Sequence, residues 1–563
     1  KDAIRVSLEA LNPSVRIGLV SFSNIVCVYD VSSTGVAKAQ AFSGLYSPKD
    51  STWDKLAAYT APVQNCLENV MRIMDALIDS VENKKTITSH RCLGSAVEFA
   101  MALMGIEESN RRSVFCSGRI IGFLSGVPNF GPGGVAESED EQQESFQVEQ
   151  ATKYFKGLGL RCHQSDVEID IICGGLKQFN IQLIQNLVLA NGGTVILQKD
   201  FEGEDFVANL KETVGRVCGR KGSIEMKFSD QVNVTHIIGS ALAAQTESSR
   251  NSSFSCLMGS VQPRSNIAVY FNINDDIIGD FVYFQFRTKF INSQNQYVQR
   301  IITRRLETTG NRKTFLSSLD ADVVAVLLAK KIVLQSRSSN DTQDVLENLD
   351  KTLYRILVNC GSKERQGFKM PAELVPLPRK LFLLRRGPLL GPLLQHPDDI
   401  DYMRCLFLNS PFEDCKRLIE PPFYMAENTE YKYYQIPLED LALQSNKVLL
   451  LDHHTDIFIW SGNLTLTEEY EEQRKNLLLL AQELRKHRFP QPQILQFKEN
   501  SSMARWLQCR LIPSHKDTPE EQLVAFPQLE ELPQPVRTKL ASKFHRTDDL
   551  SYNQYVRGLL KRF

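Results

Sequence analysis

The spacing of apolar residues changes along this 563-residue chain, and these changes constrain the fold more than any other feature of the sequence. In residues 1–216, short apolar runs alternate with helical patterns, which predicts a doubly wound sheet of parallel strands. In 217–310 apolar residues recur at every second position, as in an antiparallel β-sandwich. Helical patterns return in 311–409, and 410–563 has the mixed pattern of a compact α+β domain. The chain is too long for one core, so we predict a multidomain α/β plus all-β plus α fold over these four ranges.

The strands and helices of the first region follow from its apolar runs. Ile4, Leu8 and Leu11 form a helical stripe at the start, so the strand that should precede this helix in a parallel sheet is missing from the sequence. Further strands are predicted at 16–22, 119–126, 166–173 and 192–197, and further helices at 65–81, 90–104 and 176–189.

The two middle regions differ in the spacing of their apolar residues. Strands of the second are predicted at 223–229, 235–240, 265–273, 280–290 and 297–307. The third has two helices within 314–360. One side of the first helix is predicted to carry Val323, Val324, Leu327, Leu328 and Lys331, and the stripe of the second is Val345, Leu349, Leu353 and Leu357. The proline-rich stretch 371–397 is predicted to break into short helical pieces.

The last region combines strands and helices. Two strands joined by a polar turn are predicted within 447–462, and a further strand at 493–497. A long helix is predicted at 468–487, a short capped helix at 501–511, and a closing helix after Asp549.

The charge and cysteine content exclude several classes of protein. A formal net charge of −1 gives no overall attraction to nucleic acid or to a membrane. The twelve cysteines are scattered without a CxxC pair, which favours reduced thiols over a disulfide framework or a zinc site. No apolar run approaches the ~20 residues that span a bilayer, and no signal-peptide block is found, so we expect a cytosolic protein.

Five motifs in the second half of the chain occur in the order found in one family. They are LFLLRR (381–386), VLLLDHHTDIFIW (448–460), RFPQPQI (488–494), MARWLQCRLIPS (503–514) and TDDLSYNQYV (547–556). Together they resemble the GTPase-activating subunit of the COPII inner coat, the Sec-twenty-three family. The first region agrees, with GLVSFSN (18–24), AYTAPVQ (58–64), LGSAVEFAMALM (93–104) and IDIICGGLKQFNI (169–181).

The resemblance implies an architecture. It consists of a von Willebrand factor A-like trunk, a β-sandwich, a helical domain and a gelsolin-like domain, over the four ranges given above. The family also has an N-terminal zinc finger, which would precede the first residue of this sequence. Zinc is therefore expected only in residues that this sequence lacks, and no cofactor or metal is expected within it.

The resemblance also implies a function. It is that of a COPII coat subunit in transport from the endoplasmic reticulum to the Golgi, which activates a GTPase and has no complete active site of its own. The implied partners are a Sar-type small GTPase, a cargo-binding sister subunit bound through the trunk, outer-coat subunits and an anionic membrane surface, with no nucleic acid. The implied location is cytoplasmic, peripheral on the endoplasmic reticulum membrane and COPII vesicles.

One residue matches the family's arginine finger, and it is Arg505. Such an arginine stabilises the negative charge that builds on the phosphoryl oxygens during GTP hydrolysis. Arg505 is predicted to point outward, because helical spacing places one apolar face on the opposite side, made of Met503, Trp506, Leu507 and Leu511. Ser501 and Ser502 are candidate caps, and the free N–H groups of the first turn would favour a phosphate.

Two departures from the family's pattern leave a second function open. The family has a Gly-Gly pair before the helix, where this chain has Glu499-Asn500-Ser501-Ser502, and 514–540 has the character of an insertion. The alternative is a coat-like scaffold or cargo adaptor of the same architecture without GTPase-activating activity. A third function, actin binding through the gelsolin-like domain, is weaker because no calcium loop is found.

Other features admit both a functional and a structural interpretation. The glycine-rich run 125–135 follows a predicted strand but lacks the spacing of a phosphate-binding loop, which favours rigid turns. The pair His453-His454, flanked by two aspartates, has the composition of a metal site, but a polar turn is the commoner arrangement. Arg510 is predicted to extend along the apolar face rather than to act in catalysis. The other basic groups are predicted to be solvated: Arg111-Arg112, Arg304-Arg305, Arg385-Arg386 and the run 485–488.

Overall fold

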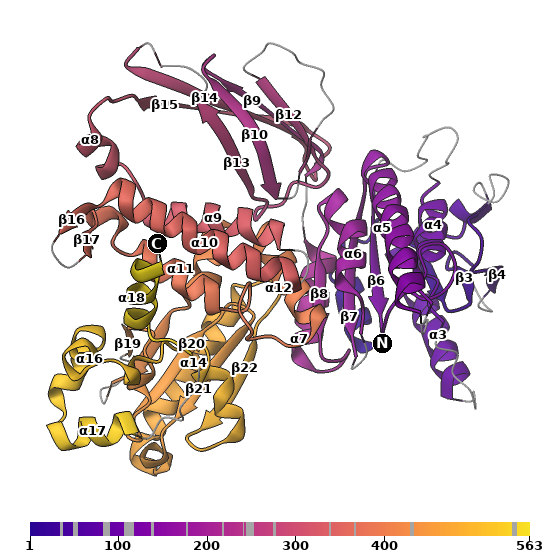
Figure 1. Cartoon of the computed structure of the whole chain (residues 1–563). Helices are drawn as coiled ribbons and strands as arrows, with labels where there is room; N and C mark the ends of the chain where they lie inside the picture. The colour runs from indigo at the N-terminus through magenta and orange to yellow at the C-terminus, as the bar shows by residue number, and fades with distance from the viewer. Residues whose placement is uncertain are drawn as a thin grey trace. The chain divides into compact units, whose positions relative to one another are not determined.

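The computed structural model divides the chain into two compact units, Lys1–Thr308 (unit 1) and Thr309–Phe563 (unit 2) (Figure 1). The described residues are 1–33, 38–48, 55–82, 90–105, 117–136, 140–175, 178–216, 219–239, 241–243, 253–273, 277, 279–336, 339–364, 367–427, 433–542 and 549–562. The pair Arg111-Arg112 lies outside them. Within them, no helix is both long and apolar enough to cross a bilayer.

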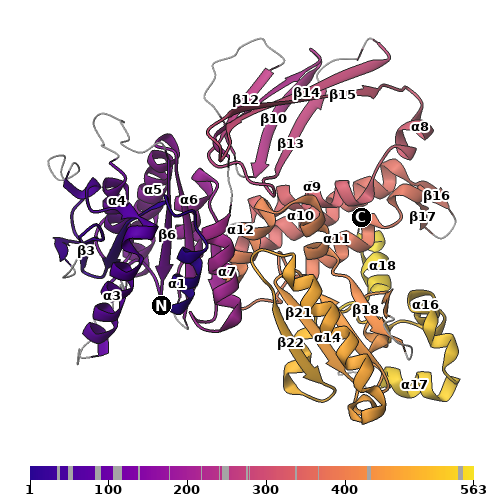
Figure 2. The same ribbon diagram turned by 180° about the vertical axis from the view of Figure 1, so that it is seen from behind.

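Residues 1–216 of unit 1 contain a parallel sheet with helices on both faces. Its strands are, in order, β6 (Gly118–Leu124), β7 (Val167–Gly174) and β8 (Val195–Gln198). The helices beside it are α1 (Asp2–Glu9), α5 (Glu141–Gln164), α6 (Ile181–Val188) and α7 (Gly203–Gly215). Figure 1 shows α5 and α6 over one face, and Figure 2, seen from behind, shows α1 and α7 over the other. This cover explains why every residue of β7 is buried, and the three predicted parallel strands are confirmed.

The strands near the start of the chain do not join this sheet, so the prediction of a parallel strand at 16–22 is wrong. β2 (Leu19–Phe22) pairs antiparallel with β3 (Ile25–Asp30), which pairs antiparallel with β4 (Lys38–Ser43). Only two residues separate β2 from β3, and so short a connection joins antiparallel neighbours, because a parallel pair needs a long crossover. The remaining elements are β1 (Arg16–Ile17), β5 (Ala61–Pro62), α3 (Val63–Glu82) and α4 (Leu93–Leu103).

The second region of unit 1 is antiparallel, as its period-two pattern predicts. Its strands are β9 (Arg220–Phe228), β10 (Val232–Gly239), β11 (Leu242–Ala243), β12 (Ser253–Met258), β13 (Ile267–Ile273), β14 (Phe281–Ile291) and β15 (Tyr297–Glu307). One sheet has the order β11-β12-β9-β14-β15, and β10 pairs with β13 in the other. The core includes Met226 and Val232, and the rings of Phe228 and Phe284 meet edge to face at 5.5 Å.

Unit 2 begins with a group of helices. They are α8 (Arg312–Ser317), α9 (Ala321–Gln335), α10 (Ser339–Cys360), α11 (Leu377–Arg386), α12 (Pro397–Asn409) and α13 (Phe412–Ile419), with the hairpin β16–β17 (Ser362–Glu364 and Gly367–Lys369) after α10. The predicted stripe of α10 is confirmed, since all four of its members are buried. The proline-rich stretch does contain a short helix, α11.

The apolar side predicted for α9 is wrong. Val323 is 40% exposed and Lys331 is exposed, the other three predicted residues are half-buried, and Ala325, Ala329 and Lys330 are buried instead. The reason is that α9 contacts α10, α11, α12 and α13. A helix surrounded by others is apolar around most of its circumference, so its sequence does not single out one buried face.

The rest of unit 2 is built on a five-stranded sheet. Its strands are β18 (Phe423–Ala426), β19 (Tyr433–Ile436), β20 (Val448–Asp452), β21 (Asp456–Ser461) and β22 (Gln493–Lys498), in the order β19-β18-β20-β21-β22. The helix α14 (Glu471–Lys486) connects β21 to β22, which are therefore able to pair in parallel. Leu477 and Ala481 of α14 pack on Leu450 and Ile459 of the sheet (Figure 2). The strands and the long helix predicted for this region are confirmed.

Short helices follow β22. They are α15 (Arg505–Gln508), α16 (Pro519–Ala525), α17 (Gln534–Ser542) and α18 (Tyr552–Arg562). The closing helix α18 packs on α10 and α11, where the Tyr555 hydroxyl donates to Asp350 (2.8 Å) and the Tyr555 and Phe382 ring centres are 5.1 Å apart. The chain end is thus fixed to the helices that begin unit 2.

Candidate functional site

The turn that carries Arg505 is tight and capped at its start. Residues 502–504 form a 3-10 turn that continues into α15. The Ser501 hydroxyl accepts a hydrogen bond from the Met503 N–H (3.3 Å), so this predicted cap is confirmed. Ser502 is not a cap, because it lies inside the turn, where its carbonyl oxygen accepts a bond from Arg505 Nε (2.9 Å). A helical stretch this short adds little N-terminal potential, so the guanidinium itself must supply the positive charge.

Buried residues occur at every third position of this segment, whereas the repeat of an α-helix is 3.6 residues. Ala504, Leu507 and Arg510 are buried, and the residues between them are exposed. The predicted apolar face is therefore half wrong: Leu507 and Leu511 are buried, but Met503 and Trp506 are 49% and 47% exposed. The 3-10 geometry at the start of the turn places residues i and i+3 on one side, which explains the difference.

The Arg505 side chain is exposed, as the sequence predicts. Its Nε donates to the Ser502 carbonyl oxygen, which holds the start of the side chain against the turn. Within the described ranges, no carboxylate forms an ion pair with this guanidinium. The terminal nitrogens are therefore open to an anionic group of another molecule.

The residues before the turn fix its backbone without glycine. Asn500 has a φ of 68°, the left-handed conformation that glycine favours and asparagine tolerates. The Glu499 carboxylate accepts bonds from the Ser445 hydroxyl (2.9 Å) and the Asn463 N–H (2.8 Å). This segment thus adopts a left-handed conformation without glycine, and the Glu499 side chain anchors it.

The residues after the turn are held by Arg386, which the sequence predicts to be solvated. That prediction is wrong, because the Arg386 guanidinium donates to the Leu511 carbonyl oxygen and lies 3.5 Å from the Asp549 carboxylate. Burial lowers the pKa of Arg386, and Asp549 opposes the change. The motifs that contain Arg386, Leu511 and Asp549 are far apart in sequence and meet here. Arg386 is thus a positioning residue for the Arg505 turn.

We expect Arg386→Ala to lower the free energy of unfolding by about 1–3 kcal/mol, because it leaves the Leu511 carbonyl oxygen without this charged donor. The measurement is urea denaturation followed by tryptophan fluorescence. Arg355→Ala is the matched control, since Arg355 is exposed on α10, and we expect it to change stability by less than about 0.5 kcal/mol. Equal stability of the two variants would contradict the positioning role.

Arg510 lies on the same segment and is 7% exposed. Its guanidinium carbon lies 4.7 Å from the centre of the Phe458 ring, and its Nη1 donates to the Trp506 carbonyl oxygen (2.5 Å). Burial lowers the pKa of Arg510, and Asp456 opposes the change. Arg510 lies on the apolar side as predicted, but the expectation that its charged end reaches solvent is wrong, because the guanidinium is buried against the Phe458 ring.

Glu439 lies beside the segment that follows the turn. Its carboxylate accepts bonds from Arg379 Nη1 (2.8 Å) and the Ser514 hydroxyl. Burial raises the pKa of Glu439 to about 7, although Arg379 and Ser514 act in the opposite direction.

The pKa of Glu439 predicts a pH dependence of stability. Between the unfolded value near ~4.3 and about 7, the folded chain holds a proton that the unfolded chain has released. The free energy of unfolding therefore contains a contribution that falls as the pH rises through this window. Glu439→Gln cannot ionise, so we expect its Tm to fall less than that of the wild type over this window. Parallel pH profiles of Tm would contradict this assignment.

The pair His453-His454 lies in the turn between β20 and β21, as predicted, but both residues are only 2% exposed. Burial lowers the pKa of both imidazoles. Arg488 binds both oxygens of Asp452, the last residue of β20, so the prediction of a fully solvated basic run at 485–488 is wrong for Arg488. In the described part of the chain, His, Cys, Asp and Glu side chains do not gather in groups of three that could hold a metal ion.

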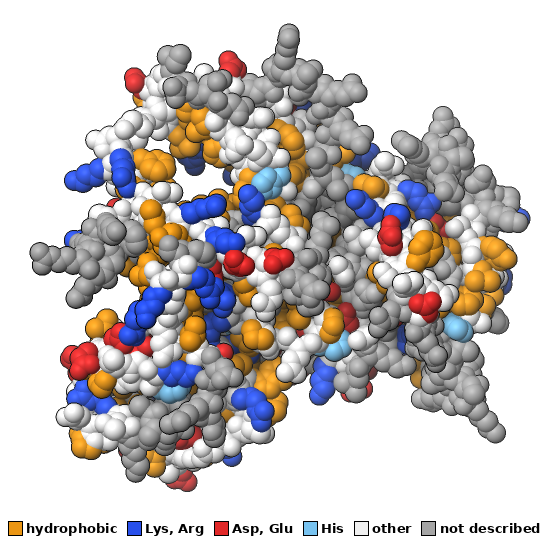
Figure 3. Space-filling view, in the orientation of Figure 1, with side chains coloured by type: hydrophobic (Ala, Val, Ile, Leu, Met, Phe, Trp, Pro, Cys, Tyr) orange, Lys and Arg blue, Asp and Glu red, His pale blue; other side chains and the backbone are white. Residues whose placement is uncertain are grey.

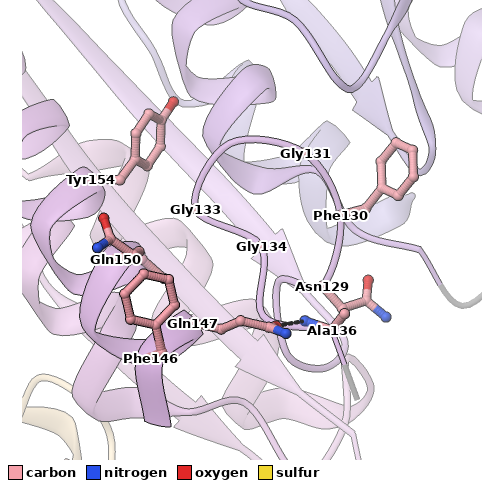
Figure 4. Close-up of a pocket in the computed structure, with 11 residues that line it drawn as sticks. Asn129, Phe130, Gly131, Gly133, Gly134, Ala136, Phe146, Gln147, Gln150 and Tyr154 are labelled. Atoms are coloured by element: carbon pink, nitrogen blue, oxygen red, sulfur yellow. Dashed lines mark hydrogen bonds between the residues drawn. The ribbon is translucent and has the colours of Figure 1, made fainter. Parts of the chain in front are cut away.

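The glycine-rich run forms turns, as predicted. The Gly134 N–H donates to the Gly131 carbonyl oxygen (2.9 Å), and the Val135 N–H donates to the Pro128 carbonyl oxygen (2.9 Å). This loop and α5 line a hollow of about 510 Å³. Figure 4 shows the loop facing residues of α5, with the Gln147 side chain accepting a hydrogen bond from the Ala136 N–H. Among the described residues that line the hollow there is no lysine or arginine, which further weakens the phosphate interpretation.

Comparison with known proteins identifies the family. Models of the Sec23/Sec24 trunk domain, the Sec23/Sec24 beta-sandwich domain and the Sec23/Sec24 helical domain match residues 1–218, 219–309 and 320–417, and the Gelsolin repeat matches 436–507. The chain belongs to the Sec23/Sec24 family. The predicted architecture of trunk, sandwich, helical and gelsolin-like domains is thereby confirmed, whereas the boundaries drawn at 216, 310 and 409 stay predictions.

Two relatives show the extent of the similarity. Protein transport protein SEC23 A of Arabidopsis thaliana is 33% identical over 576 residues, which cover 99% of this chain and 65% of that protein. The crystal structure of the human COPII-coat protein Sec24c superposes with a TM-score of 0.77 at 14% identity, over 100% of this chain and 73% of that one. The second likeness concerns the fold alone.

Proposed function

We propose that this chain is a COPII coat subunit that accelerates GTP hydrolysis on a Sar-type small GTPase, with Arg505 as the arginine finger. The observation that carries the proposal is the exposed Arg505 guanidinium on a turn fixed at both ends. Membership of the Sec23/Sec24 family supports it, as does the name of the Arabidopsis relative, a protein transport protein.

Arg505 acts in trans in this proposal. The nucleotide, Mg²⁺ and attacking water belong to the GTPase, and Arg505 stabilises the charge that develops on the transferred phosphoryl group. A finger of this kind increases the rate by roughly 10³ to 10⁵, or about 4–7 kcal/mol of activation free energy. The fixed turn matters because an arginine that must first be ordered loses part of this gain.

The proposed assembly has further partners. The chain spans 65% of the length of the Arabidopsis relative. We therefore propose the partners of this chain and do not take them over from that relative. They are a cargo-binding sister subunit bound through the trunk, outer-coat subunits and an anionic membrane surface. The proposed location is the cytoplasmic face of the endoplasmic reticulum and COPII vesicles.

The second candidate function is a coat-like scaffold or cargo adaptor without GTPase-activating activity. The changed sequence before Arg505 favours it, whereas the left-handed Asn500 argues against it. The two are separated by single-turnover GTP hydrolysis on a Sar-type GTPase, with and without this chain. Faster GTP hydrolysis supports the activator function. If the chain binds the GTPase but the rate of hydrolysis is unchanged, the adaptor function is supported instead.

A further inference from the structure

The segment that carries Arg505 has three sides of different chemistry, since burial repeats at every third residue from Ser502 to Arg510. The buried side consists of Ala504, Leu507 and Arg510. A second side is exposed and apolar, with Met503, Trp506 and Cys509. The third side is exposed and polar, with Ser502, Arg505 and Gln508. Two of the three sides are therefore open to a partner.

The open apolar side is held in place by the buried one. Exposure by itself does not mark a functional surface, because hydrophobic side chains occur over much of the surface of unit 2 (Figure 3). Trp506 is more specific, since tryptophan is enriched among the residues that dominate binding between proteins. Its carbonyl oxygen accepts hydrogen bonds from Arg510 Nη1 (2.5 Å) and from the Cys509 thiol (3.4 Å). A partner thus meets a turn whose backbone is already fixed.

Gln508 lies on the polar side together with Arg505. Both residues belong to α15, and side chains three residues apart on a helix are neighbours, with Cβ atoms about 5–6 Å apart. Within the described part of the chain, the Gln508 side-chain amide has no hydrogen-bond partner. The polar side therefore presents a guanidinium with a free amide beside it, at a spacing that lets both reach one phosphoryl group.

An amide supplies what a guanidinium lacks. The guanidinium only donates hydrogen bonds, so Arg505 is able to stabilise phosphoryl oxygens but not to accept a hydrogen bond from the attacking water. The Gln508 amide has both functions, because Oε1 accepts from water and Nε2 donates to a phosphoryl oxygen. A glutamine orients the attacking water in this way within small GTPases themselves.

We propose that Gln508 is a second catalytic residue, supplied in trans beside Arg505, which orients the water that attacks the γ-phosphorus of GTP. This role rests on the proposed function, because the nucleotide and the water belong to the GTPase. The water oxygen forms a bond to the γ-phosphorus, and the bond from phosphorus to the β–γ bridging oxygen breaks with its electron pair left on GDP. One water proton passes to a γ-phosphoryl oxygen, which gives inorganic phosphate. Gln508 exchanges no proton and holds the water in line with the leaving oxygen.

The first test is single-turnover GTP hydrolysis by a Sar-type GTPase over a range of concentrations of the full chain. We expect Gln508→Ala to lower the rate at saturation by about 10- to 100-fold, because the water is no longer held in line. The concentration that gives half of the maximal rate changes by less than about twofold. Gln508→Glu accepts but does not donate and brings a negative charge toward the phosphate, so it recovers none of the rate. Gln482→Ala removes an exposed glutamine from α14 and is the matched control with an unchanged rate.

The second test separates catalysis from a structural role. It measures binding of the chain to the GTPase loaded with GDP and aluminium fluoride, which imitates the transition state, and to the GTPase loaded with a non-hydrolysable GTP analogue. We expect Gln508→Ala to weaken the first complex by about tenfold and to leave the second unchanged, because the interaction develops in the transition state. A structural role would weaken both complexes alike. An unchanged Tm shows that the variant is folded.

The contrary outcomes are distinct for the two proposals. An unchanged rate at saturation in Gln508→Ala overturns the role of Gln508, and so does equal weakening of both complexes. Arg505→Ala is measured in parallel. If it loses the stimulated rate while Gln508→Ala keeps it, the proposed function stands and only the role of Gln508 is wrong. If the wild-type chain gives no acceleration, the proposed function is wrong and the role of Gln508 is wrong with it.

Discussion

If this chain activates a Sar-type GTPase as proposed, Arg505→Ala is expected to lower the stimulated rate of GTP hydrolysis by about 10³- to 10⁵-fold. A guanidinium is planar and permanently charged, and it can bind two phosphoryl oxygens at once, which alanine cannot do. The measurement is single-turnover hydrolysis by a Sar-type GTPase at saturating concentrations of this chain. Binding to the GTPase loaded with a non-hydrolysable GTP analogue should change much less, because the interaction develops in the transition state.

Two further variants make this result specific. Arg505→Lys keeps the charge but loses the planar fork, so we expect it to recover only a small part of the rate. Arg355→Ala removes an exposed arginine from α10 and leaves the rate unchanged. If Arg505→Ala stimulates hydrolysis as well as the wild type does, another group supplies the charge and the assignment is wrong.

The local conformation around Arg505 was only partly predictable from the sequence. Its exposure follows from any short helix that buries Leu507 and Leu511. The exposure of Met503 and Trp506 does not, because it depends on a 3-10 turn, and the sequence pattern does not separate that turn from an α-helix. The role of Arg505 stays a prediction: the motif suggested it, and the exposed guanidinium on a fixed turn supports it without testing it.

Charged residues produced the clearest errors, and they share one cause. Arg386 and Arg488 have the sequence surroundings of solvated side chains, yet Arg386 reaches Leu511 and Arg488 reaches Asp452, both distant in the sequence. A basic residue is buried only when the fold brings such a partner to it. The sequence around the residue does not reveal that partner.

The errors in the fold have a similar origin. The apolar run at 16–22 has the composition of a buried parallel strand, but its direction is set by the next strand, from which only two residues separate it. The strands at 119–126, 166–173 and 192–197 were predictable because each is followed or preceded by a helix of sufficient length for a crossover.

The buried pair of Asp452 and Arg488 gives the largest expected effect on stability. Arg488 binds both Asp452 oxygens, and Arg417 Nε lies 3.4 Å from the same carboxylate. Asp452→Ala leaves the buried Arg488 without its counter-charge, so we expect a loss of about 3–5 kcal/mol in the free energy of unfolding. Trp460, buried in the neighbouring strand β21, reports the transition by its fluorescence in urea.

Two controls separate the charge effect from simple truncation. Glu347→Ala breaks an exposed pair with Lys351 on α10 and should cost less than about 0.5 kcal/mol. The double variant Asp452→Leu with Arg488→Leu removes both charges, and we expect it to be more stable than Asp452→Ala, because no charge remains buried alone. If the double variant is instead less stable than Asp452→Ala, the pair stabilises the fold through packing and hydrogen bonds. The loss of stability in Asp452→Ala is then not caused by an uncompensated buried charge.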